Sequence, residues 1–257
     1  MTAIIPTKTT MNTETQFVKN MSSRLTLDAI CYRNYIPSEL VVIIGKYFQE
    51  EIDNKSIRVA VDMWCSKENR QKCLLRFGHI SDWDTSKVTD MSDLFRDKKT
   101  FNDNIINWDT SNVTEMSGMF RGAFRFNQSL ENWDTSKVTK MSYMFYDVKL
   151  FNQPLEKWDV SNVTKMNYVF YSCYSFNQPL EQWNVSNVTE MHSMFCNCNR
   201  FNQPLEKWDV SKVTNTCFMF YNAYSFNQPL EQWNIANVNY KYNMFLGATL
   251  FNQPLEK

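Results

Sequence analysis

The chain has 257 residues, and its 27 Lys and Arg balance 27 Asp and Glu, so the formal net charge is zero. A neutral chain has no overall field that would draw it to nucleic acid or to an anionic membrane, and five Gly in the whole chain argue against glycine-rich phosphate loops. The seven cysteines are an odd number without a Cys-x-x-Cys pair, which suggests neither a zinc ribbon nor a closed set of disulfides.

The first segment, residues 1–20, is polar and is predicted to be a disordered tail. It lacks the apolar stretch of a signal peptide and a lipobox cysteine, and no part of the chain approaches the roughly 20 apolar residues of a membrane span. The sequence therefore favours an intracellular protein over a secreted one.

Residues 21–76 are predicted to form an α-helical cap. Pro37 opens the first helix, because proline followed by an acidic residue is typical of a helix start. A second helix is expected over about 56–64 and a third over about 67–75. The end of an open repeat array needs such a cap to shield its first unit. The stretch IPSELVVIIGKYF also resembles the opening helix of an F-box, and this resemblance implies an adaptor that presents bound targets to a ubiquitin ligase.

Seven copies of a 25-residue unit occupy residues 77–257, and the last copy stops partway through a unit. Counting each unit from its Trp as position 0, position 5 is always Val, positions 12 and 18 are always Phe, and position 19 is always Asn. A constant phase means that each unit is one physical turn of the same shape. The seven tryptophans are Trp83, Trp108, Trp133, Trp158, Trp183, Trp208 and Trp233.

The apolar spacing inside a unit predicts its elements. Met166, Val169, Phe170 and Cys173 follow the i, i+3, i+4, i+7 pattern of a short amphipathic helix. Thr164 is placed to cap its start, and glycines at 122 and 247 fall where such a helix would end. Residues 155–160 alternate apolar and polar side chains as a short strand does.

These elements predict an α/β repeat solenoid of the leucine-rich-repeat type, with short parallel strands and one short helix in each coil. A single coil cannot bury its own Trp and two Phe, whereas stacked coils can. The Asn at position 19 is expected to form a ladder along the stack, in which each side chain binds loop backbone that would otherwise be unpaired.

The string WDVSNVTKMNYVFYSCYSFNQPLEK closely resembles the repeat of the BspA-like leucine-rich-repeat family, and the resemblance covers roughly residues 57–257. That repeat is widespread in mycoplasmas and other bacteria and also occurs in protists and large DNA viruses. The resemblance implies a solenoid used for adhesion or protein binding, with no catalytic residues to carry over. The bacterial members carry a signal peptide or lipid anchor, and this sequence shows neither.

Residues that could carry chemistry are few. His79 and His192 lie in different units and outside any nucleophile constellation, and His192 is interpreted as a tolerant surface position. Cys173 and Cys198 share position 15 of adjacent units, where a column of packed small residues is favoured over a disulfide or a metal pair. The sequence predicts no enzyme activity, no metal and no cofactor.

Positions 10, 13 and 16 vary between units and are rich in tyrosine, which gives a large contact area at a low cost in conformational entropy. We therefore expect a non-enzymatic scaffold that binds protein partners. Because the array stops at FNQPLEK within a unit, an open sheet edge and end-to-end self-association are also expected. The candidate protein-binding face consists of Tyr143, Tyr146, Tyr168, Tyr171, Tyr174, Tyr221 and Tyr224.

Overall fold

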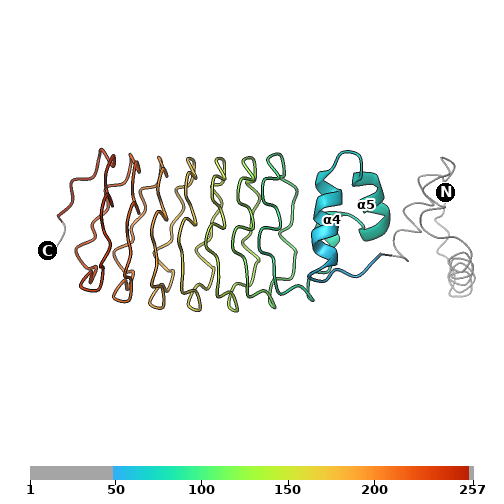
Figure 1. Ribbon diagram of the computed structural model, residues 1–257, viewed down its shortest axis with the longest axis horizontal. Helices are drawn as coiled ribbons and strands as arrows, with labels where there is room; N and C mark the ends of the chain where they lie inside the picture. Colours follow the sequence, from blue (N-terminus) through green and yellow to red (C-terminus); the bar gives the residue numbers. More distant parts are fainter. Residues whose placement is uncertain (1–48, 255–257) are drawn as a thin grey trace, which may run out of the picture.

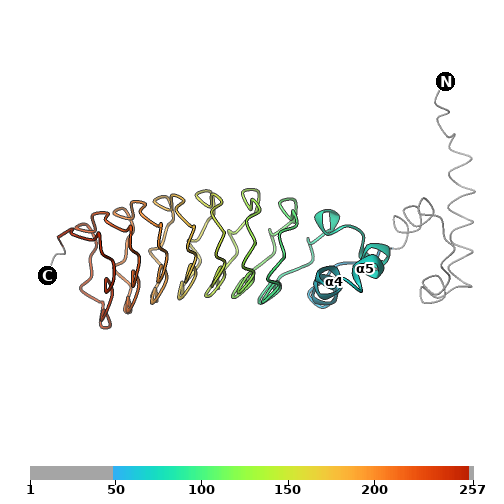
Figure 2. The same cartoon turned by 90° about the horizontal axis from the view of Figure 1, so that it is seen from above.

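The computed structural model describes residues 49–254. Its helices are α4 (Ser56–Cys65), α5 (Arg70–Phe77) and the 3-10 helix η1 (Ile80–Asp82). They are followed by a row of similar coils that stack side by side, with α4 and α5 at the N-terminal end of the row (Figure 1). The same row is seen from above in Figure 2. The expected tail over 1–20 and the F-box-like helix opening at Pro37 lie outside the described residues.

Helix α4 confirms the helix expected over about 56–64. Its buried residues, Ile57, Ala60, Val61 and Trp64, have helical spacing and form one apolar face. Helix α5 begins later than the predicted residue 67, because the chain first makes a turn in which Arg70 N donates to Ser66 O at 2.9 Å.

The helices are fastened to the first coils by polar as well as apolar contacts. Trp64 Nε1 and Arg70 Nη2 donate to the two carboxylate oxygens of Asp103, each at 2.9 Å. The Trp64 ring also lies 6.2 Å from that of Trp83, the first Trp of the array. One continuous hydrophobic core runs from Ile52 to Trp233, so the helices cover the first coil as part of the same folding unit.

The core of the row consists of aromatic columns. Phenylalanines at position 12 stack on the equivalent ring of the next coil, as Phe145 does on Phe170 at 5.6 Å. Within a coil the two phenylalanines also stack, as Phe170 and Phe176 do at 4.2 Å. Position 0 forms a third column, in which every indole N–H after that of Trp83 donates to a main-chain carbonyl 28 residues earlier, as Trp183 does to Leu155 at 2.9 Å. The repeated residues therefore build the scaffold.

Main-chain hydrogen bonds connect each coil to the next over positions 7–14. Met166, Tyr168, Phe170 and Ser172 donate to carbonyls of the following coil at 2.8–3.1 Å. The amides in between bond within their own coil to the carbonyl three residues earlier, as Tyr171 N does to Tyr168 O at 3.2 Å. Every second amide therefore donates to the next coil, and the amides between them close turns within their own coil.

This pattern differs from the predicted helix over Met166–Cys173. All four residues of the stripe are buried as expected, yet they lie on successive turns, and among the described residues of the coils no helix is formed. An α-helix uses its amides internally and is about 10 Å wide, whereas the stacked rings repeat every 5.6 Å. Helices could not fit side by side at that spacing.

The other expected local elements also differ. Within the described coils, residues 155–160 form no strand, and the parallel bridges are isolated ones at position 7, such as Lys165 to Glu190. Thr164 does not cap a helix; its carbonyl instead accepts from the amide and hydroxyl of Thr189 in the next coil, at 2.9 and 3.2 Å. The residues at position 6 therefore link successive coils by hydrogen bonds.

The asparagine ladder is confirmed. The side-chain oxygen of Asn152 accepts from the main-chain N–H of Asn177 at 2.9 Å and from Gln178 Nε2 at 3.0 Å. The same pair of bonds recurs where Asn177 accepts from Asn202 and Gln203. Most of these asparagines are half-buried rather than fully buried. Each one gives a loop amide its partner in the neighbouring coil.

Candidate protein-binding groove

Two residues in each coil, at positions 10 and 14, have a positive φ. Position 14 suits this left-handed conformation, because it holds Gly, Asn, Asp or Ser in every coil. Position 10 holds bulky aromatics in three coils: Tyr143 at 63°, Tyr168 at 59° and Phe218 at 56°. Such a residue in this conformation costs roughly 1–3 kcal/mol, and strain of this kind clusters at binding sites.

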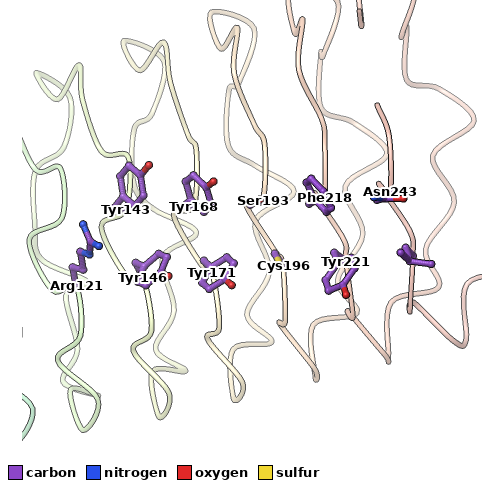
Figure 3. A pocket seen from close by; sticks show the side chains of 11 residues that line it. Arg121, Tyr143, Tyr146, Tyr168, Tyr171, Ser193, Cys196, Phe218, Tyr221 and Asn243 are labelled. Carbon is purple, nitrogen blue, oxygen red and sulfur yellow. The ribbon is translucent and has the colours of Figure 1, made fainter. Parts of the chain in front are cut away.

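The side chains of positions 10 and 13 form two parallel columns that line a groove of about 550 Å³ across several coils (Figure 3). Tyr143 stacks on Tyr168 in one column, with ring centroids 4.7 Å apart, and Tyr146 stacks on Tyr171 in the other, at 4.5 Å. The groove is lined by Arg121, Tyr143, Tyr146, Tyr168, Tyr171, Ser193, Cys196, Phe218, Tyr221, Asn243 and Leu246.

Arg121 occupies position 13 one coil before the first tyrosine pair. Its guanidinium carbon lies 5.4 Å from the ring centroid of Tyr143 and 5.1 Å from that of Tyr146. Both distances are within the range of cation–π attraction. The tyrosine columns therefore already hold one guanidinium of the chain itself.

Both columns are interrupted in the coil that follows Tyr168 and Tyr171. Ser193 and Cys196 stand at positions 10 and 13 there, only 5% and 4% exposed, and the rings resume with Phe218 and Tyr221. Figure 3 shows the resulting gap between Tyr171 and Tyr221, with Cys196 between them. Burial raises the pKa of the Cys196 thiol to about 12, so this thiol is protonated at neutral pH.

His192, interpreted from the sequence as a tolerant surface position, is half-buried and contacts a residue of the groove. Its ring meets that of Tyr168 edge to face at 4.6 Å, and its Nδ1 lies 3.8 Å from Glu190 Oε2. Burial lowers the pKa of His192, so the imidazole is neutral at neutral pH.

Burial also governs the tyrosines of the groove. It raises the pKa of both Tyr143 and Tyr171 above the usual phenol value. Their hydroxyls therefore remain neutral donors and acceptors over the physiological pH range, and the columns present uncharged ring faces.

The structure brings together five tyrosines of the predicted face: Tyr143, Tyr146, Tyr168, Tyr171 and Tyr221. Tyr174 and Tyr224, at position 16, do not line the groove, although they are 40% and 45% exposed. The prediction missed Arg121, Ser193, Cys196, Phe218, Asn243 and Leu246. Reading positions 10 and 13 as complete columns, instead of selecting tyrosines, would have found all six.

The cysteine column at position 15 is a packing feature. Cys173 and Cys198 are free and buried, and their thiols donate to the carbonyls of Phe145 and Phe170 in the preceding coil at 2.9 and 2.8 Å. Burial raises the pKa of both thiols. Within residues 49–254, no cluster of His, Cys, Asp or Glu could hold a metal ion.

No helix in the described part of the chain is long and apolar enough to cross a membrane. The sequence profile of a family described as "Mycoplasma protein of unknown function, DUF285" matches residues 66–181 and 153–257. These two overlapping matches span α5 and the whole row of coils. No curated protein and no solved structure is significantly similar to the chain.

Proposed function

Because the chain belongs to the DUF285 family, whose function is unknown, we propose from its geometry that it is a non-enzymatic scaffold that binds protein partners along the tyrosine groove. The observation that carries this proposal is the strained backbone at position 10. Three bulky aromatics keep a left-handed conformation that Gly or Asn would adopt at lower cost, and all three line the groove.

The composition of the groove supports the same proposal. Tyrosine and arginine are enriched in protein interfaces and carry much of their binding energy. Here the rings of Tyr146 and Tyr171 stack face to face, and Arg121 closes one end. Side chains fixed by such mutual packing lose little conformational entropy on binding.

The finer class of the array is part of this proposal. The repeat resembles that of BspA-like proteins, and we place the array with leucine-rich-repeat-like solenoids on that resemblance. Stacked coils with a constant phase support this assignment. Adhesion and protein binding, the uses implied by the resemblance, both require a surface of variable side chains on a constant scaffold, as positions 10 and 13 provide.

The groove can be tested by affinity capture with the full chain from lysate of its natural host. The double variant Tyr146→Ala and Tyr171→Ala is expected to capture at least tenfold less partner than the wild type, because it removes the stacked pair of rings from one column. The matched control is Tyr240→Ala, which removes a tyrosine that is 55% exposed outside the groove. Equal capture by the double variant and the wild type would contradict the proposal.

Self-association through the last described coil is a separate prediction. There, core-type residues Met244 and Phe245 are only partly buried and line a cavity of about 360 Å³ together with Trp233. Multi-angle light scattering is expected to show a mass that rises with concentration. Met244→Glu should suppress the rise, whereas Leu150→Glu, at a side chain 52% exposed in a central coil, should not. A constant monomer mass at high concentration would count against the prediction.

A further inference from the structure

The gap in the position-13 column corresponds to one missing ring, at Cys196. Rings one coil apart in this column lie 4.5 Å from each other, as Tyr146 and Tyr171 do. Tyr171 and Tyr221 are two coils apart, and the residue between them is Cys196, which brings no ring (Figure 3). We call this space, walled by Tyr171 and Tyr221 above Cys196, the slot. One planar group in it would stack on both walls at ordinary distances.

Ser193 lies beside the slot, in the position-10 column, and offers a hydrogen-bond acceptor. Ser193 is 5% exposed, and its hydroxyl makes no hydrogen bond with the described residues. Because Ser193 lines the groove, a ligand that supplies a donor can pair with this hydroxyl.

Negative charge lies in the same coil. Glu190 approaches the neutral imidazole of His192 at 3.8 Å, and the imidazole ring in turn packs on Tyr168 at 4.6 Å. The carboxylate is thus held near Tyr168, in the position-10 column next to the column that contains the slot. A negative charge at this side of the groove favours a cationic occupant over an anionic one.

The chain itself shows which cation these columns accept. The Arg121 guanidinium lies 5.1 Å from the Tyr146 ring centroid, in the same column and facing the ring as the next member of the stack would. A guanidinium is planar, carries several N–H donors and stacks on aromatic faces, whereas a lysine ammonium is a compact point charge that fills no flat space.

We propose that the slot receives the guanidinium of an arginine side chain from a protein partner, stacked between Tyr171 and Tyr221 and donating to the hydroxyl of Ser193. This rests on the proposed function and specifies its ligand chemistry. The rest of the groove contacts the partner chain on either side, and the arginine sets the register of that chain along the coils.

The probe for this site is the peptide acetyl-Gly-Arg-Gly-amide, titrated into the full chain and followed by saturation-transfer NMR. We expect saturable binding of this peptide. Replacing the arginine with citrulline, which has the same shape but no charge, should weaken binding at least tenfold, as should replacing it with phenylalanine. Equal binding of the phenylalanine peptide would overturn the arginine assignment.

The decisive variant is Cys196→Tyr, which fills the slot with the side chain found at position 13 in neighbouring coils. It should abolish binding of the arginine peptide and leave the thermal midpoint unchanged or higher. Leu150→Tyr adds a tyrosine at an exposed position outside the groove and should bind as the wild type does. If Cys196→Tyr unfolds the chain, Cys196→Phe provides the same test at the same position with a ring that lacks the hydroxyl.

Failure of the slot and failure of the groove give different results. Arginine-peptide binding that is unchanged in a folded Cys196→Tyr variant overturns the slot. If partner capture is then still lost in the Tyr146→Ala and Tyr171→Ala double variant, the proposed function stands without it. Capture retained in that double variant overturns both.

Discussion

Replacing Phe170 with alanine is expected to lower the free energy of unfolding by about 3–5 kcal/mol, the range for a fully buried phenylalanine. The ring is completely buried and stacks on Phe145 and on Phe195 at 5.6 Å, and on Phe176 at 4.2 Å. Its loss opens a cavity at both faces of its coil. Urea unfolding followed by circular dichroism measures the change.

The control for this prediction lies in the same coil. Tyr174→Ala also removes an aromatic ring, but from a side chain that is 40% exposed, and it should cost less than about 1 kcal/mol because little apolar surface is uncovered. A loss below about 1 kcal/mol for Phe170→Ala would show that the aromatic columns do not hold the coils together.

Replacing Asn177 with leucine should be the next most damaging change, at about 1–3 kcal/mol. The side-chain oxygen of Asn177 accepts from the main-chain amide of Asn202 at 2.9 Å and from Gln203 Nε2 at 3.0 Å. Leucine has nearly the same size but no acceptor, so both donors lose their partner where the neighbouring coil restricts access of water. The measurement is again the urea midpoint.

Asn177→Asp separates the lost acceptor from any change in shape. Aspartate keeps an oxygen in the same place, and a carboxylate is a stronger acceptor for an N–H donor, so this variant should stay within about 1 kcal/mol of the wild type. Equal destabilisation by leucine and aspartate would mean that the amide donor of Asn177, and not its oxygen, supports the ladder.

Several features could be predicted from the sequence, because they depend only on which residues occupy equivalent positions in successive units. The constant 25-residue phase placed every Trp, Phe and Asn column in register, and residues with equal positions do stack or bond in the structure. The buried stripe from Met166 to Cys173 was also identified correctly from its spacing alone. Repetition makes such inferences strong, since each position is sampled seven times.

The local conformation of that stripe did not follow from the sequence. The i, i+3, i+4, i+7 pattern describes which residues face inward, and both a helix and a series of turns can satisfy it. The neighbouring coil decides between them, because its carbonyls accept hydrogen bonds from every second amide, such as those of Tyr168 and Phe170. Those amides are then not available to an α-helix. Hydrogen bonds between residues about 25 apart are invisible to a local periodicity.

The binding groove shows the same division. The sequence alone determined that the chain is a stack of like units and that tyrosines gather at its variable positions. Only the tertiary structure decided that positions 10 and 13 share a groove from which position 16 is excluded, and that Ser193 and Cys196 leave a slot between rings. The physical reason is that left-handed turns at positions 10 and 14 set the direction of each side chain, and stacking between coils holds those turns in place.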